Sequence, residues 1–212
     1  KDFIFYFKIG WFHIMSTAAT DHLFFIAVLA IIYSFADWRK VLVLITAFTI
    51  GHAITLFLSV LELINLNIDW VEFLIPCTIL VTAMMNLLFQ KQQVASHAIQ
   101  YGMALGFGLI HGLGYANYIR MILSADQQLI WGLFSFNLGL EAGQIVVVCL
   151  VLLTVWVSSR VHAKAHMRWV SFVSAFVLFF ALKLALEGFL SKVYLVESTF
   201  VFFASHHQKN ND

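Results

Sequence analysis

Long, almost uninterrupted apolar runs are the feature that most constrains this chain. Each of six runs is near the roughly 20 residues that a helix needs to cross a bilayer, and they cover residues 20–36, 41–64, 70–90, 97–123, 127–157 and 167–190. Apolar residues make up 62% of the chain and charged residues 11%, against about 45–50% and about 25% in soluble domains. Only helices and closed barrels satisfy the backbone in lipid, and these runs lack the alternation of barrel strands. The sequence therefore predicts an all-α, polytopic membrane helix bundle.

Lysine and arginine are unevenly distributed over the connections between the runs. The first, third and fifth connections hold Arg39, Lys40, Lys91, Arg160, Lys164 and Arg168. The second connection holds none, and near the fourth the run that precedes it holds only Arg120. Since cytoplasmic connections are rich in these residues, we expect both termini outside. Residues 1–191 are expected to form one transmembrane domain that begins with an interfacial segment over the first fifteen residues. The tail, 192–212, holds one short apolar element.

Asp21 and His22 stand side by side at the start of the first run. Charged groups near hydrocarbon are costly and mark functional positions. A helix N-terminus accounts for the acid, but it leaves His22 unexplained. Together with His13, eight residues before Asp21, they form an imidazole and carboxylate set that suits divalent nickel, cobalt, zinc or iron.

Polar side chains also share one face within the second and fifth runs. They are Thr49 and His52 in the second run, and Asn137, Glu141 and Gln144 in the fifth. Spacings of three and four residues place side chains on one helix face. A carboxylate at mid-membrane costs about 2.5–3.5 kcal/mol unless it is protonated, paired or bound to a cation. Glu141 is therefore a candidate ligand, and an ion pair with Lys183 is the structural alternative.

The fourth run is rich in glycine. Gly102 and Gly106 are four residues apart, as are Gly108 and Gly112. Such spacing lets helix backbones approach each other closely. His111 lies among these glycines, which leave room for an ion beside its imidazole.

In the expected orientation, four helices bring ionisable groups to the outer half of the bundle. The candidate metal ligands are His13, Asp21, His22, His52, His111 and Glu141, with Thr49, Asn137 and Gln144 as supporting polar residues. No nucleophile motif such as GxSxG is present, so no catalytic residue is assigned. The net charge of +1 provides no basic stripe for a nucleic acid.

Four blocks, "HIMSTAATDHLFF", "ITAFTIGHAITLFLS", "GFGLIHGLGYANYIR" and "FSFNLGLEAGQ", resemble in the same order the signature blocks of the HupE/UreJ family. The resemblance covers roughly residues 5–150. It implies a small membrane protein of the bacterial inner membrane, with about six spans, that acts as a nickel or cobalt permease. The family's motif, a histidine followed by an Asp-His pair, maps onto His13, Asp21 and His22. Here seven residues separate the histidine from the pair, whereas five do so in the usual motif.

Three functions remain open at this point. The first is a divalent-metal permease that captures the ion at Asp21 and His22 and passes it inward. The second is a membrane metalloenzyme that holds one nickel, cobalt or zinc ion at the same cluster. The third is a non-transporting scaffold whose polar residues hold the bundle together. The lipid bilayer and a metal ion are the expected partners, and other membrane subunits or a second copy of the chain stay open.

Overall fold

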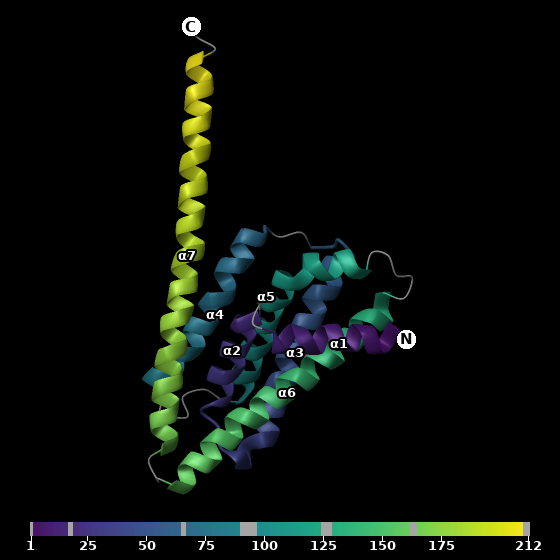
Figure 1. The fold of residues 1–212 in the computed structure, drawn as a ribbon, viewed down its shortest axis with the longest axis vertical. Helices are drawn as coiled ribbons and strands as arrows, with labels where there is room; N and C mark the ends of the chain where they lie inside the picture. The colour runs from purple at the N-terminus through teal and green to yellow at the C-terminus, as the bar shows by residue number, and fades with distance from the viewer. Residues whose placement is uncertain are drawn as a thin grey trace.

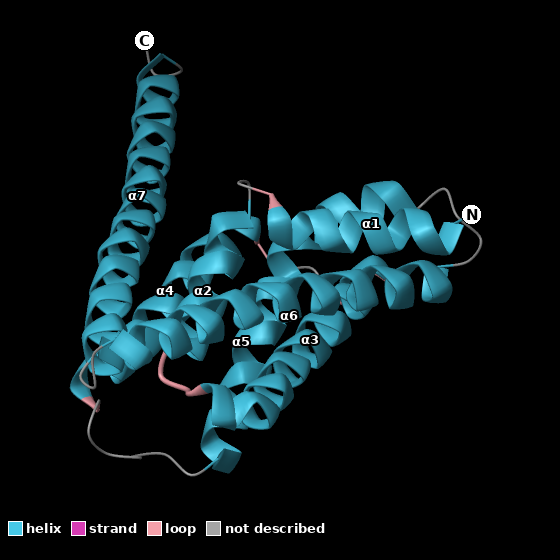
Figure 2. Cartoon of the chain, turned by 60° about the horizontal axis from the view of Figure 1, so that its bottom comes forward, coloured by secondary structure: helices cyan, strands magenta, loops and turns pink. Residues whose placement is uncertain are grey.

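The computed structural model describes residues 2–16, 19–64, 67–89, 97–123, 129–161 and 165–209. Within these ranges the regular elements are all helices and no strand occurs, as predicted (Figure 2). In chain order they are α1 (Asp2–Met15), α2 (Thr20–Ala30), the short 3-10 helix η2 (Phe35–Asp37), α3 (Trp38–Val60), α4 (Ile68–Leu88), α5 (His97–Leu123), α6 (Leu129–Val161) and α7 (Ala165–Lys209).

Three helix pairs make the main contacts of the bundle. The first helix packs along α6, α3 packs along α5, and α4 packs along α7. The first two pairs meet at glycines. A Cβ added at Gly10 or Gly139 would collide with the facing backbone of α6 or α1, and one at Gly51 or Gly108 would collide with that of α5 or α3. Figure 1 shows α1 crossing the end of the bundle where α6 begins.

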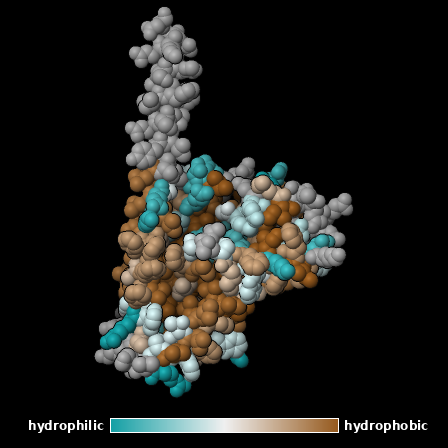
Figure 3. All heavy atoms as spheres, viewed as in Figure 1, coloured by the Kyte–Doolittle hydropathy of each residue, from teal (hydrophilic) through white to brown (hydrophobic). Residues whose placement is uncertain are grey.

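The surface of the bundle suits a bilayer. Figure 3 shows hydrophobic side chains over most of the visible face, with hydrophilic residues gathered mainly toward its ends. Large exposed apolar residues such as Phe172 and Phe179 contribute to this surface. A soluble monomer rarely exposes so much apolar area, which agrees with a membrane-embedded chain.

The range 20–36, expected as the first span, is not one continuous helix in the structure. Helix α2 ends at Ala30 after 11 residues, which is about 16 Å long and too short for a hydrocarbon core of about 30 Å. The chain then turns, and a capping box at Ser34 and Asp37 starts the next helical segment. The Ser34 hydroxyl donates to the Asp37 carboxylate at 2.8 Å. The box marks the start of a new helical segment, because the two side chains accept hydrogen bonds from backbone N–H groups that have no partner in the first turn of a helix.

Six spans were expected, and the described residues hold four or five helical segments that pass a test of length and composition. By length and composition, four segments can cross a membrane: Phe35–Val60, Ile68–Leu88, Leu129–Arg160 and Ala165–Leu190. A fifth is added if α1 and α2, bent by 71° at their junction, form one broken span. Helix α5 covers the predicted range of residues, but its glycines and polar side chains make it less apolar than these four.

Helix α7 is a single element of 45 residues. It passes the end of the predicted last span and continues to Lys209, so the tail predicted from residue 192 is helical in continuity with that span. Figure 1 shows the C-terminal part of α7 extending well beyond the other helices.

Candidate metal centre

The break between α1 and α2 brings two predicted ligand groups together. His13 lies in the last turn of α1, and Asp21 and His22 lie in the first turn of α2. The two helices bend by 71° at this junction, so the end of one meets the start of the other. The Ser16 backbone N–H donates to the Phe12 carbonyl and completes the last turn of α1. Discontinuous helices of this kind place helix ends inside a membrane bundle, where ion sites are found.

The pairing of α3 with α5 positions two further histidines. A Cβ at Gly108 would collide with the Phe48 backbone, and one at Gly112 would collide with the backbone of His52. The two helices therefore lie as close as their backbones permit, which sets His52 of α3 beside His111 of α5. A Cβ at Gly102 or Gly106 would meet nothing within 4 Å, so the close packing expected of these two glycines is not observed.

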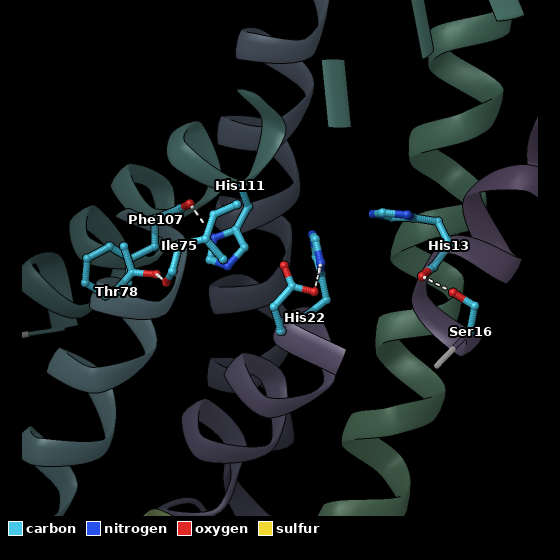
Figure 4. A network of polar contacts seen from close by, with 8 residues as sticks. His13, Ser16, His22, Ile75, Thr78, Phe107 and His111 are labelled. Atoms are coloured by element: carbon cyan, nitrogen blue, oxygen red, sulfur yellow. Dashed lines mark hydrogen bonds and ion pairs between the residues drawn. The ribbon is translucent and has the colours of Figure 1, made fainter. Parts of the chain in front are cut away.

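Four imidazole rings converge at this place. One possible ligand atom from each of His13, His22 and His52 lies within 4.8 Å of the other two. The ring centre of His111 lies 5.0 Å from that of His22, and His22 lies between His13 and His111 (Figure 4). The rings of His22, His52 and His111 are buried, and that of His13 is half-buried. Four separate helices thus contribute to one cluster, within the part of the chain that the structure describes.

Two of these rings have partners that fix which nitrogen carries the proton. The Nδ1 atom of His22 lies 3.2 Å from a carboxylate oxygen of Asp21, and Nδ1 of His111 lies 2.8 Å from the Phe107 carbonyl. Both oxygens accept, so Nδ1 donates in each case and Nε2 keeps its lone pair. A carboxylate or carbonyl behind the histidine is the usual support of a metal-binding imidazole, because it fixes the ring and raises its basicity.

The remaining nitrogens of the cluster are buried without a hydrogen-bond partner among the described residues. They are Nε2 of His13, His22 and His111, and both ring nitrogens of His52. A buried polar atom left unpaired costs about 1–3 kcal/mol. One nitrogen of each neutral ring keeps a lone pair, so a cation at this point would satisfy one nitrogen of each histidine. The other nitrogen of His52 carries a proton, and Asn137 lies next to that ring.

Aromatic side chains enclose the cluster. The ring centre of Tyr115 lies 3.8 Å from that of His13, and Phe136 stacks on Tyr115 at 5.6 Å. On another side, Phe25 and Phe48 stack at 4.9 Å and contact His111 at 5.4 and 5.1 Å. These walls exclude water and make it more costly to leave the nitrogens unpaired.

Glu141, Thr49 and Gln144 hydrogen-bond across the α3–α6 interface rather than at the converging nitrogens. The Thr46 hydroxyl donates to Glu141 at 2.6 Å, and the Thr49 hydroxyl donates to the Gln144 side-chain oxygen at 2.9 Å. Asn137 lies next to His52. Lys183 pairs with Glu187 at 3.6 Å rather than with Glu141. The structure thus places Asp21 behind His22 and Glu141 on the α3–α6 interface.

The distances show what the cluster can do chemically. Imidazole nitrogens bind a zinc ion at about 2.0–2.1 Å, so two nitrogens on one such ion are at most about 4.2 Å apart. The observed span of 4.8 Å must therefore contract by a fraction of an ångström when an ion binds. Nitrogen donors without thiolates suit nickel, cobalt, copper and zinc rather than calcium or magnesium.

Sequence reasoning missed the aromatic walls and the Phe107 carbonyl. The spacing of four residues between Phe107 and His111, and again between His111 and Tyr115, is a helical signal that could have identified both. The contact between His13 and Tyr115 has no such signal, because it joins residues that are far apart in the chain.

A comparison with protein-family models matches residues 1–191 to the family described as HupE / UreJ protein. Comparisons with curated proteins and with solved structures found no significant match.

Proposed function

Because the chain belongs to the HupE/UreJ family, a family of nickel/cobalt transporter type, we propose that it is a permease for a divalent transition metal of the nickel or cobalt class. It is a multi-pass membrane protein whose helices can span a bilayer. We further propose that it lies in the bacterial inner membrane, with α1 and α2 as one broken span and α5 also crossing, so that an even number of spans leaves both termini outside. The excess of lysine and arginine in the first, third and fifth connections supports this orientation.

The convergence of unpaired imidazole nitrogens carries the proposal. Ligand atoms of His13, His22 and His52 approach within 4.8 Å of one another, and the Nε2 atom of His111 is buried and unpartnered beside them. A structural role alone leaves these nitrogens unsatisfied, because none of them donates to or accepts from a described neighbour. A divalent ion with a preference for imidazole satisfies them.

We assign the donors to successive positions along the route of the ion. His13 is half-buried and lies on the helix nearest the N-terminus, so it makes the first contact. His22, held by Asp21, brings the ion into the bundle. His52 and His111 are fully buried and receive it. The 4.8 Å spacing supports transient binding, since a tight closed site holds its donors closer together.

Uptake of radioactive cobalt or nickel tests the proposal. Cells without their own uptake system for the metal express the chain, the double variant His22→Ala/His111→Ala, or the control His166→Ala. His166 contacts the Ile31 carbonyl at 3.0 Å and lies outside the cluster. We expect the double variant to lose uptake at equal membrane abundance, and the control to retain it. Robust uptake by the double variant would refute the assignment.

The metal content of the purified protein separates a permease from an enzyme. Full-length chain is purified in mild detergent without chelator and its metal is measured by mass spectrometry. A permease releases its cargo, so we expect much less than one ion per chain. One tightly held ion per chain, absent from His22→Ala/His111→Ala, would favour a resident metal and an enzymatic role.

A further inference from the structure

Two threonines of α3 reach across to two polar residues of α6. Thr46 donates to Glu141 at 2.6 Å and Thr49 donates to Gln144 at 2.9 Å. Both pairs have members three residues apart on each helix, so the four side chains lie side by side. Thr49 and Gln144 are buried, Glu141 is half-buried, and Thr46 reaches the surface of the chain.

This group continues the histidine cluster along the same interface. Thr49 and Thr46 precede His52 by three and six residues, which places them about 4.5 and about 9 Å away along the helix axis. Asn137, next to His52, has a buried side-chain oxygen without a hydrogen-bond partner among the described residues. A row of polar groups therefore leads from His52 to Glu141.

The charge of Glu141 is not balanced by a basic side chain. No ion pair of the described residues includes it, and Lys183 is paired with Glu187 instead. It lies near the middle of the segment Leu129–Arg160, which can span a membrane. A carboxylate at this depth is costly unless it is neutralised, and a bound cation neutralises it.

The neighbouring amide gives a second, independent sign of a ligand. Gln144 is 1% exposed, and its side-chain nitrogen is buried without a partner. The two ends of an amide are assigned from hydrogen bonding rather than observed. In the reversed orientation the nitrogen donates to Thr49 and the oxygen turns toward the unpaired position, where it offers a lone pair. Both threonine hydroxyls can rotate to do the same.

We propose that Thr46, Thr49, Glu141 and Gln144 form a second cation site, built from oxygen donors, next to the histidine cluster. A role for this site in transport rests on the proposed permease function, whereas cation binding at the site does not depend on it. Carboxylate, amide and hydroxyl oxygens are harder donors than imidazole. A transition-metal ion of the nickel or cobalt class therefore binds here more weakly than at the histidines and can leave.

Buried apolar side chains follow the oxygen site along α3 and α6. Leu44 on α3 and Val148 and Leu152 on α6 are buried in the core of the bundle. The buried polar row ends at the oxygen site, so an ion that reaches it must wait for these side chains to move. Among the described residues of this interface, the site is thus the last polar position before these apolar side chains, and beyond them the first turn of α3 holds Arg39 and Lys40.

Manganese binding tests the proposal directly. Mn²⁺ prefers oxygen donors, and its free and bound forms are distinguished by electron paramagnetic resonance. The purified full-length chain in mild detergent is titrated with Mn²⁺, and then separately with Co²⁺. We expect Glu141→Gln to weaken Mn²⁺ binding by at least about tenfold and to leave Co²⁺ binding at the histidines nearly unchanged. His52→Ala should show the reverse. The control is Glu72→Gln, an exposed carboxylate of α4.

A second pair of variants guards against misfolding. Thr49→Ser keeps the hydroxyl, and Thr49→Val removes it at similar volume, so only the latter should weaken Mn²⁺ binding. The proposal is overturned if the wild-type chain binds no Mn²⁺, if Glu141→Gln binds it normally, or if Glu141→Gln loses Co²⁺ as fully as His52→Ala. Failure of cobalt uptake in cells would instead count against the proposed permease function. It would not affect the Mn²⁺ binding result for the oxygen site.

Discussion

The close approach of α3 and α5 at Gly112 leads to a quantitative prediction. A Cβ at this position would lie 3.0 Å from the His52 carbonyl carbon and closer still to its oxygen and to the Thr55 hydroxyl, whereas ordinary contact begins at 3.4 Å. Gly112→Ala therefore forces the two helices apart by at least 0.4 Å, the difference between these two distances. Overpacking of this kind costs about 1–3 kcal/mol.

The same displacement affects metal binding, because Gly112 is adjacent to His111 and faces His52. Nitrogens of His13, His22 and His52 already span 4.8 Å and must contract to share one ion. Further separation makes that contraction more costly. If all of the strain opposed binding, the affinity for Co²⁺ would fall by about 5- to 150-fold.

Gly102→Ala is the matched control, with the same substitution in the same helix. A Cβ there meets nothing within 4 Å, and alanine favours a helix over glycine by about 0.5–1 kcal/mol. The unfolding temperature in detergent and the Co²⁺ affinity by calorimetry should fall for Gly112→Ala and not for Gly102→Ala. Equal behaviour of the two variants would refute the reasoning from the backbone contact.

Three further predictions concern side chains around the cluster. Asp21→Asn should lower Co²⁺ affinity by about 10- to 100-fold without lowering the unfolding temperature, and an unchanged calorimetric affinity would contradict its orienting role. Tyr115→Ala should weaken Co²⁺ binding because it frees the His13 ring, while Tyr115→Phe keeps the stacked ring and should bind normally; equal loss in both would instead implicate the hydroxyl. Asn86→Ala removes a buried hydrogen bond of 2.7 Å to α2 and should destabilise the protein by about 1–3 kcal/mol in thermal unfolding. Its metal affinity per folded molecule should stay normal, and a lower one would connect this distant bond to the site.

The sequence predicted the helical class and the polar faces of individual helices, because both depend on local composition and spacing. The apolar run from residue 20 does not form one continuous helix, and the reason is physical. An apolar sequence is compatible with a straight helix and equally with a helix that ends at Ala30. Only the capping pair Ser34 and Asp37 marks the boundary, and the prediction gave it no weight.

The assembly of the cluster could be predicted only in part. Spacing identified His52 and His111 as members of polar or glycine-rich faces, but it contains no information on which helices become neighbours. Seven residues separate His13 from Asp21, two more than in the family's usual motif, so the spacing alone did not show whether the His13 ring reaches the site. In the structure α1 and α2 bend by 71° at their junction, and the ring centre of His13 lies 4.8 Å from that of His22.

The distribution of the four histidines over four helices has a thermodynamic consequence. An ion bound by all of them is a cross-link between segments almost a hundred residues apart, and it binds only to the folded chain. Such a ligand at 100 times its dissociation constant adds about 2.7 kcal/mol to the free energy of unfolding. The loaded protein is then stiffer than the empty one. In the proposed permease, this cross-link must be broken each time an ion passes, which favours modest affinity over tight binding.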